Sequence, residues 1–342
     1  MLMALKLAHR ASLMVLFLIS TDKLHCSSVQ VDPPEEIKII DPGHLGYLEI
    51  TWTLPSSLIN IQECPISYQL EYYNAYTKSW DVIQTPQRTF RAQFDLTKDI
   101  RVRAYTLLGG RCANNTWIKS ANYKELVQKP PGTGRHVNAV KEFRFVFYNL
   151  EQMICNWNKD PNAPASSQLH MYYWHNELEK TEECPQYLFT NEVRTGCNLT
   201  GKRFPDFTDV NFCVNGSSPE GPLKPTYASL QIQNYVKPDR PDKLNLLTGR
   251  FGEIKLFWKK PDGKVPGHCL EWEVERIREG PHGKNESRIF TMHTRLTLPA
   301  VGHKERNCFT IRTRLHKYCA EGSFWSEWSP KTCHTGGSKY DG

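Results

Sequence analysis

The chain has 342 residues, a formal net charge of +7 and 39% hydrophobic residues. This length is enough for two or three domains, and the apolar content is sufficient for packed cores. Beyond residue 20, no stretch approaches the roughly 18 apolar residues of a membrane-spanning helix, so we expect no membrane span in this sequence.

The first 26 residues are typical of a secretory signal peptide. A basic entry that ends at Arg10 precedes an apolar run, 11–20, which is too short to span a bilayer. We place cleavage between Ser20 and Ser28. Without Cys26, ten of the 11 cysteines remain. An even number of cysteines behind a signal peptide predicts an oxidised, extracellular protein, either secreted or the ectodomain of a cell-surface protein.

Two proline-rich joints, 129–134 and 236–241, divide the rest of the chain. Such segments mark turns or linkers rather than strand interiors. We expect three domains of about 100 residues each. They span 29–130, 134–236 and 238–333, and a tail follows at 334–342.

Short runs that alternate between apolar and polar residues fill each segment, and no long helical period occurs. Alternation with period two between Gly, Pro and Asn turns predicts β-sandwiches. The expected strands include Tyr47–Trp52, Ser67–Tyr72, Leu169–Trp174, Glu253–Trp258 and Phe309–Arg314. The fold class is therefore all-β, with three tandem sandwiches of the fibronectin type III or immunoglobulin-like kind. Sequons at Asn114, Asn198, Asn215 and Asn285 predict N-glycans on a secreted chain.

The last segment ends in Trp325-Ser326-Glu327-Trp328-Ser329, and an alternating run upstream carries Arg312 and Arg314. Two guanidinium planes on one strand and two indoles on its neighbour can interleave, each contact contributing about 0.5–1 kcal/mol when exposed. This pattern resembles the WSxWS box of type I cytokine receptors, which lies in their membrane-proximal fibronectin-III domain. We interpret the box as a structural element whose serine hydroxyls bond neighbouring backbone.

The first and third segments repeat each other. In both, a tryptophan closes a strand, a proline follows, and a cysteine opens the next run. The parallel residues are Trp52, Pro55, Cys64 and Cys112 in the first segment and Trp258, Pro261, Cys269 and Cys319 in the third. In a fibronectin-III sandwich the two cysteines of each segment would lie at one end of neighbouring strands, so we expect the bridges Cys64–Cys112 and Cys269–Cys319.

Cys308 and Cys333 are equidistant from a turn near Ala320–Glu321, so a hairpin would place them opposite each other. A bridge closing this loop of about 25 residues would contribute roughly 3 kcal/mol.

In the middle segment we expect the bridge Cys184–Cys197. Cys155 and Cys213 either pair with each other or stay as buried thiols.

Further stretches extend the resemblance from Pro33 to Cys333 and point to the subgroup of interleukin-5 and interleukin-13 receptor alpha subunits. They are Val31–Pro34, Asp41–Tyr47, Phe94–Leu96, Cys213–Ser218 and Asn234–Pro238. The resemblance implies a cytokine-binding elbow between the last two domains and an extra first domain. The implied partner is a helical cytokine of the interleukin-13/interleukin-4 type.

At the elbow, the resemblance implies four cytokine-binding residues: Phe207, Glu271, Tyr318 and Glu321. A Cys269–Cys319 bridge would hold two of their loops side by side and lower the ordering cost of binding. Aromatic loop tips make good hot spots, and the carboxylates would attract a basic helix face. The alternatives are loop packing for Phe207 and plain solvation for each glutamate.

In the first domain, the resemblance implies that an edge strand lies against a strand of the cytokine by β-augmentation. We assign this edge to 80–84, with Val82 and Ile83 at the contact. An ordinary core-facing strand is the alternative.

Three positions depart from the family's pattern. Phe145 occupies the place of the cysteine that usually bridges to Cys155. Phe207 stands where a tyrosine is expected, which removes a hydroxyl contact, and Glu271 replaces an aspartate.

The sequence has no Cys-x-x-Cys pair, no His-Glu-x-x-His and no nucleotide-binding glycine loop, so we expect no metal site, no cofactor and no enzyme activity. Nor do we expect a nucleic-acid partner or a stable homo-oligomer. Basic residues gather late in the chain, where they either bind a glycosaminoglycan or stack on tryptophans and face solvent. They include Arg276, Arg278, Lys284, Arg288, Arg295 and Arg312.

We predict an extracellular protein that captures an interleukin-13-like cytokine as a decoy without signalling of its own. One alternative is the ligand-binding subunit of a signalling receptor whose membrane anchor is not in this sequence. The other is a fibronectin-III adhesion protein that binds glycosaminoglycan.

Overall fold

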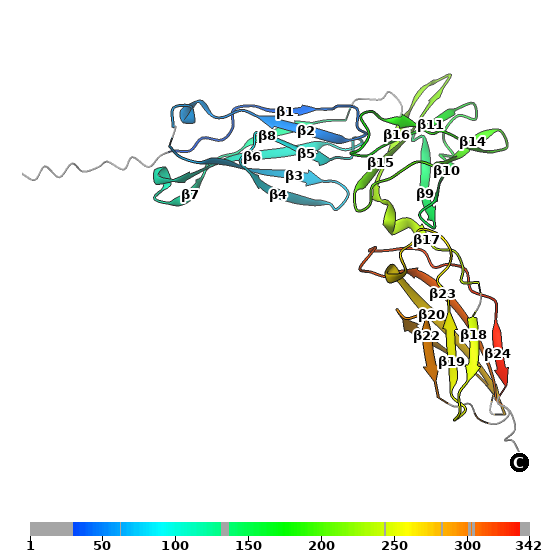
Figure 1. Ribbon diagram of the computed structural model, residues 1–342. Helices are drawn as coiled ribbons and strands as arrows, with labels where there is room; N and C mark the ends of the chain where they lie inside the picture. Colours follow the sequence, from blue (N-terminus) through cyan, green and yellow to red (C-terminus); the bar gives the residue numbers. More distant parts are fainter. Residues whose placement is uncertain are drawn as a thin grey trace, which may run out of the picture.

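A computed structural model describes residues 30–61, 63–130, 137–242, 244–281, 283–299, 302 and 305–335. The expected signal peptide with Cys26, most of the first joint and the end of the tail lie outside these residues. Figure 1 shows three β-sandwiches: one end of the first meets the second, and the third extends from the second at a sharp angle to the first. The predicted all-β fold is confirmed, since the helices in the described residues are short 3₁₀ segments.

The first sandwich packs the sheet β1-β2-β5 against the sheet β4-β3-β6-β7, with β8 pairing with β6. Alternation in β2 turns Leu48, Ile50 and Trp52 into the core between them. The strands are β1 (Ile37–Ile40), β2 (Tyr47–Trp52), β3 (Ile66–Asn74), β4 (Ser79–Thr85), β5 (Thr89–Gln93), β6 (Ile100–Gly110), β7 (Thr116–Lys119) and β8 (Lys124–Gln128). The 3₁₀ turns are η1 (Ser56–Leu58) and η2 (Arg111–Ala113).

The second sandwich packs the sheet β13-β14-β10-β9-β17 against the sheet β12-β11-β15-β16. The strands are β9 (Val140–Tyr148), β10 (Gln152–Lys159), β11 (Gln168–Trp174), β12 (Glu182–Glu183), β13 (Tyr187–Thr190), β14 (Val193–Asn198), β15 (Asp209–Ser218), β16 (Gly221–Gln231) and β17 (Val236–Lys237). The turn η3 (Ile232–Tyr235) leads into the third sandwich.

The third sandwich packs the sheet β18-β19-β22 against the sheet β21-β20-β23-β24. The strands are β18 (Leu244–Thr248), β19 (Ile254–Trp258), β20 (Leu270–Gly280), β21 (Gly283–Thr291), β22 (Arg295–Leu298), β23 (Arg306–Leu315) and β24 (Thr332–Thr335), and η4 spans Gly267–Cys269.

Four disulfides link the pairs that the sequence led us to expect, and the two remaining cysteines of the described residues are free. The bridges are Cys64–Cys112, Cys184–Cys197, Cys269–Cys319 and Cys308–Cys333. Cys155 and Cys213 are buried thiols, so the alternative in which they pair with each other is wrong. Cys155 lies in the sandwich core, whereas Cys213 alternates with the core residues Phe212 and Val214 and faces the other side of its sheet.

Phe145 lies directly opposite Cys155 across β9 and β10. Its ring packs at 4.7 Å from the ring of Phe212, so an aromatic side chain fills the place where the family's bridge would stand.

One continuous buried cluster runs through the second and third sandwiches, from Ala139 to Ala320. The first sandwich has buried clusters of its own. The angle between the second and third sandwiches is therefore set by shared apolar packing.

Candidate functional site

The WSxWS segment lies against β23 and forms a cation–π stack with it. The guanidinium carbon of Arg312 is 4.6 Å from the ring centre of Trp325 and 4.4 Å from that of Trp328. That of Arg314 is 4.5 Å from Trp325. The segment itself is not a β-strand, contrary to the expectation that both indoles stand on a neighbouring strand.

Serine side chains replace a regular ladder along this segment. The amide of Ser326 donates to the carbonyl of Thr313 at 2.8 Å, and its hydroxyl accepts from the amide of Thr313 at 3.0 Å. Ser329 makes the same two bonds to Ile311, at 2.8 Å and 3.1 Å. Each hydroxyl therefore does what a strand carbonyl would do, which holds the indoles over the arginines.

Glutamates of β20, the strand paired with β23, form ion pairs with the arginines of the stack and balance their charge. Arg312 pairs with Glu273 at 2.6 Å, and only 1% of the Glu273 side chain is exposed. Arg314 pairs with Glu271, its cross-strand neighbour. Arg288 contacts Glu273 and Glu275.

Several of the basic residues that suggested a polyanion site are therefore engaged locally. In addition to Arg288 and Arg312, Arg276 donates to Asn307 and Lys284 pairs with Glu286.

The elbow is fixed by polar contacts between the second and third sandwiches. Phe324 donates its amide to the carbonyl of Val236 at 2.9 Å, and Glu321 donates its amide to Asn234 Oδ1 at 2.8 Å. Lys237 and Glu327 form an ion pair at 2.7 Å, and this hydrogen bond lowers the pKa of the Glu327 carboxyl.

Two exposed aromatic side chains belong to loops of the second and third sandwiches, and the first of them, Phe207, also lines the hollow between the first and second sandwiches. Phe207 is 68% exposed, and Tyr318 is 79% exposed. The backbone of Phe207 is left-handed, with φ 55°, which costs a non-glycine residue about 1 kcal/mol. Such strain concentrates at binding sites. Tyr318 lies beside Cys319, whose bridge to Cys269 ties its loop to the start of β20.

The two expected glutamates differ in their surroundings. Glu271 is occupied by Arg314, so its charge is turned toward the Arg–Trp stack. Glu321 has an exposed side chain beside Tyr318, in the loop that touches Asn234.

Strand β4 is the edge of its sheet among the described strands, and it pairs with β3. Val82 is 56% exposed, whereas Ile83 packs against the core of the first sandwich. The segment 80–84 therefore combines an open edge with an ordinary core-facing side chain.

The junction of the first two sandwiches is polar and aromatic. His44 stacks on Trp174 with ring centres 4.2 Å apart, and Asn211 donates to Gln93 Oε1 at 2.6 Å. Thr181 donates its hydroxyl to the carbonyl of Gly43 at 2.6 Å.

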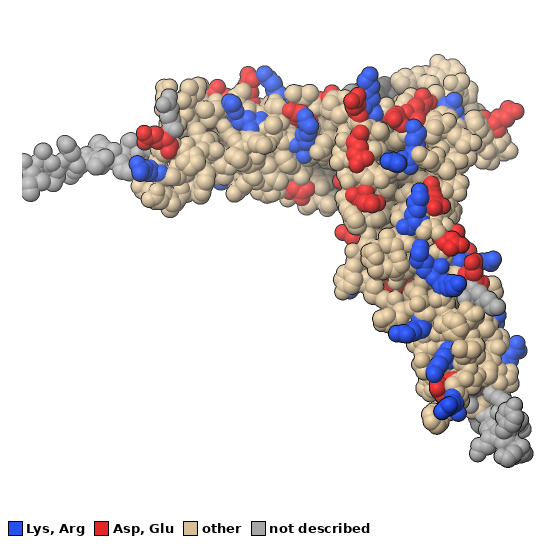
Figure 2. Space-filling model, viewed as in Figure 1, with Lys and Arg blue, Asp and Glu red and all other residues tan. Residues whose placement is uncertain are grey.

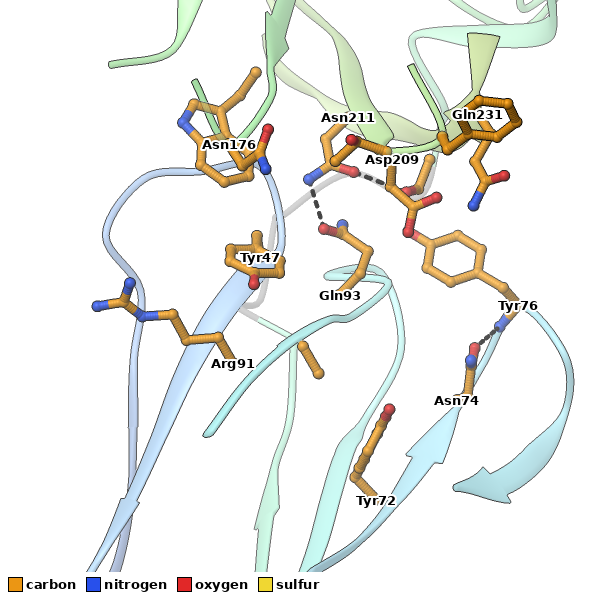
Figure 3. Close-up of a pocket in the computed structure, with 15 residues that line it drawn as sticks. Tyr47, Tyr72, Asn74, Tyr76, Arg91, Gln93, Asn176, Asp209, Asn211 and Gln231 are labelled. Carbon is orange, nitrogen blue, oxygen red and sulfur yellow. Dashed lines mark hydrogen bonds between the residues drawn. The ribbon is translucent and has the colours of Figure 1, made fainter. Parts of the chain in front are cut away.

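Two hollows open along this junction toward the elbow. The junction pocket has a volume of about 530 Å³, and Figure 3 shows the side chains that line it, from both sandwiches. The corner hollow, of about 560 Å³, reaches Tyr235 and Phe324 at the elbow. Tyr76 and Ser229 line both hollows, so the two are neighbours.

Sequence reasoning missed Tyr76, Tyr235 and Phe324. For Tyr76 the sequence held one signal, an aromatic residue in the turn that follows Asn74. In the structure, Asn74 Oδ1 accepts a hydrogen bond from the amide of Tyr76 at 3.0 Å.

The four sequon asparagines differ in exposure. Asn114 and Asn285 are exposed, whereas Asn198 and Asn215 are half-buried. No described helix has the length and apolarity needed to cross a membrane.

These features define the extracellular part of a cytokine receptor, and comparison with known proteins agrees. The family model described as "Interleukin-6 receptor alpha chain, binding" matches residues 143–235. Interleukin-13 receptor subunit alpha-2 of Homo sapiens is 32% identical over 94% of this chain and 84% of its own length. That of Canis lupus familiaris is 31% identical over 91% of this chain and 79% of its own. The chain belongs to the interleukin-13 receptor subunit alpha-2 family.

More distant similarities are also found. Interleukin-13 receptor subunit alpha-1 of Homo sapiens is 27% identical over 88% of this chain and 71% of its own. A solved structure titled "Cytokine receptor complex - Crystal form 1A" has 18% identity and a TM-score of 0.44, and covers 58% of this chain and 98% of that chain.

Proposed function

We propose that this chain binds a helical cytokine, interleukin-13-like before interleukin-4-like, in the angle between its second and third sandwiches. The observation that carries the proposal is the pair of exposed aromatic side chains, Phe207 in a loop of the second sandwich and Tyr318 in a loop of the third. Exposed aromatic residues on rigid supports are favoured hot spots because little entropy is lost when they are buried.

The other expected residues surround this pair. Glu321 carries an exposed charge that speeds the encounter with a basic helix face. Glu271 acts through Arg314, whose orientation it holds. Val82 contacts a cytokine strand added to the edge of β4, and Ile83 supports that edge from the core.

The role that we propose, that of a decoy receptor, requires only binding of the cytokine and no enzymatic step. A secreted or cell-surface chain that holds the cytokine in this angle lowers the concentration of free cytokine, which is the action of a decoy. The relatives' names favour interleukin-13 as the first ligand to test.

The test is surface plasmon resonance of residues 27–342 against interleukin-13 and interleukin-4 of the same species. We expect tight binding of interleukin-13 and a loss of about tenfold or more in Phe207→Ala and in Tyr318→Ala. Phe251→Ala is the matched control, because Phe251 is 89% exposed in the turn after β18, at the far end of the third sandwich. Failure of the folded, disulfide-bonded protein to bind either cytokine would contradict the proposal.

A further inference from the structure

The junction pocket has aromatic walls from the first sandwich. Tyr47, Tyr72 and Tyr76 come from β2, β3 and the turn that follows β3, and they line one hollow. Figure 3 shows the Tyr76 ring with its hydroxyl end directed toward Asp209 of the second sandwich. Aromatic faces attract cations through their quadrupole, so three tyrosines in one pocket favour a positively charged guest.

The charges in the pocket also favour a cation. Among the described lining residues, Arg91 is the basic one, and it is held by Glu49 at 2.7 Å. Asp209 lines the pocket from the start of β15 and has no ion-pair partner among the described residues. The unbalanced charge at the pocket is therefore negative.

The hydroxyl of Tyr76 stays neutral at physiological pH. Although 41% of the residue is exposed, burial of the phenol raises its pKa to about 12; a hydrogen bond with Gln93 opposes this effect, and the nearby charges of Asp95 and Asp209 add to it. A neutral hydroxyl beside Asp209 offers a further oxygen to a donor group, and it does not repel a cation.

The pocket is assembled before any ligand arrives. Asn211 bonds Gln93 across the junction, and its Oδ1 accepts from Ser229 at 2.7 Å. Together with the His44–Trp174 stack, these contacts hold both walls in place. A preformed site costs little ordering on binding.

Other guests fit less well. An anionic side chain would meet the unpaired carboxylate of Asp209, and an apolar one would leave that carboxylate desolvated without a partner. We propose that the junction pocket receives a lysine or arginine side chain of the protein ligand that occupies the elbow. This inference rests on the proposed function, because the shared walls at Tyr76 and Ser229 connect the pocket to the corner hollow beside the elbow.

The test compares Asp209→Asn with Asp206→Asn in binding interleukin-13 by surface plasmon resonance. Both variants remove one negative charge from the same stretch of chain, but Asp206 does not line the pocket. We expect about tenfold weaker binding for Asp209→Asn and less than threefold weaker binding for Asp206→Asn. The difference in affinity between the two variants should become smaller at high salt, which screens the charge. Tyr76→Ala should weaken binding more than Tyr76→Phe, which keeps the ring.

A cytokine series completes the experiment. Each surface lysine and arginine of interleukin-13 is replaced by glutamine, and each variant is measured against wild-type receptor and Asp209→Asn. At one cytokine position, the substitution should weaken binding to the wild-type receptor about tenfold. The same substitution should hardly weaken binding to Asp209→Asn any further, because that receptor has already lost the partner charge. If the wild type binds tightly and Asp209→Asn matches Asp206→Asn, the pocket inference is overturned while the proposed function stands. If the folded wild type does not bind, both fall.

Discussion

At the scale of single residues, Arg312 shows how one side chain connects two kinds of interaction. It contacts both indoles of the WSxWS segment and pairs with Glu273, which is almost fully buried. Arg312→Ala should destabilise the third sandwich by up to about 3–5 kcal/mol, because the buried carboxylate of Glu273 loses its closer partner and keeps only Arg288, at 3.3 Å. Arg312→Lys keeps the charge but loses the flat guanidinium, so its cost should be smaller, about 1–2 kcal/mol. Urea unfolding followed by tryptophan fluorescence measures both.

The control for this prediction is Arg306→Ala. Arg306 is exposed and lies 3.9 Å from Glu279, a separation at which a surface ion pair contributes at most about 1 kcal/mol. Equal losses for Arg306→Ala and Arg312→Ala would contradict the importance of the buried pair.

The two free thiols give a second prediction at this scale. Burial raises the pKa of Cys155 well above its ordinary range and raises that of Cys213 to about 12. Above about pH 8.5 an unfolded thiol loses its proton while the folded one keeps it, so stability falls as pH rises. The contribution of Cys213 should fall by about 1.4 kcal/mol per pH unit until about pH 12.

Cys213→Ala isolates this contribution. Urea unfolding at several values of pH between about 8 and 11 should show a shallower decline in the variant than in the wild type. Parallel declines would show that Cys213 does not titrate with a raised pKa.

At the scale of elements, β4 places neighbouring residues in opposite surroundings. Val82 is exposed and Ile83 faces the core, as strand alternation requires. Val82→Asp should leave the melting temperature of the first sandwich nearly unchanged and weaken cytokine binding about tenfold. Ile83→Asp should lower the stability of the first sandwich by several kcal/mol, because a charge enters the core.

Circular dichroism and surface plasmon resonance on both β4 variants separate the two effects. Unchanged binding by a folded Val82→Asp protein would exclude the edge of β4 from the contact. Normal stability of Ile83→Asp would contradict the assignment of Ile83 to the core.

The sequence predicted the strands that keep one face in solvent. The expected strand Tyr47–Trp52 coincides with β2, and Leu169–Trp174 falls within β11. In β15 the apolar residues Val210, Phe212 and Val214 also alternate with Asn211 and Cys213, but alternation could not predict that all five residues are buried. Asn211 shows the reason, since it faces outward from its own sheet and is covered by the first sandwich.

The resemblance to the family singled out Phe207 and Tyr318 in the sequence. The structure shows that both side chains are exposed, and their role in binding stays a prediction. The junction pocket was not predictable, since Tyr76 and Asp209 lie far apart in sequence and meet only after two sandwiches dock. The environment of Glu271 was missed for a similar reason, because its partner Arg314 stands on another strand of the sheet.

At the scale of the whole molecule, charge is distributed unevenly along the bent shape. Figure 2 shows acidic and basic side chains together where the two arms meet, and lysines and arginines along the arm that holds β18–β24. On a protein of net charge +7, attraction of a basic ligand therefore depends on single carboxylates without an ion-pair partner among the described residues, such as that of Asp209, rather than on a broad acidic surface.

The cores predict how the molecule unfolds. Because the second and third sandwiches share one buried cluster and the first has its own, calorimetry should show a smaller transition and a larger one. Leu70→Ala, at a fully buried site of the first sandwich, should lower only the smaller transition, by about 2–5 kcal/mol. Ile311→Ala, equally buried in the third, should shift the larger transition as a whole.

A separate peak for the second sandwich in Ile311→Ala would mean that the elbow is a hinge between independent cores. Small-angle scattering of the free protein then measures whether the elbow has one angle or many, which matters for binding. A shared core predicts one elbow angle for the free protein, so Phe207 and Tyr318 keep a fixed separation and the cytokine meets a prepared angle. If the second and third sandwiches had independent cores, the elbow would sample many angles. Cytokine binding would then be weakened by the entropy lost when one angle is fixed.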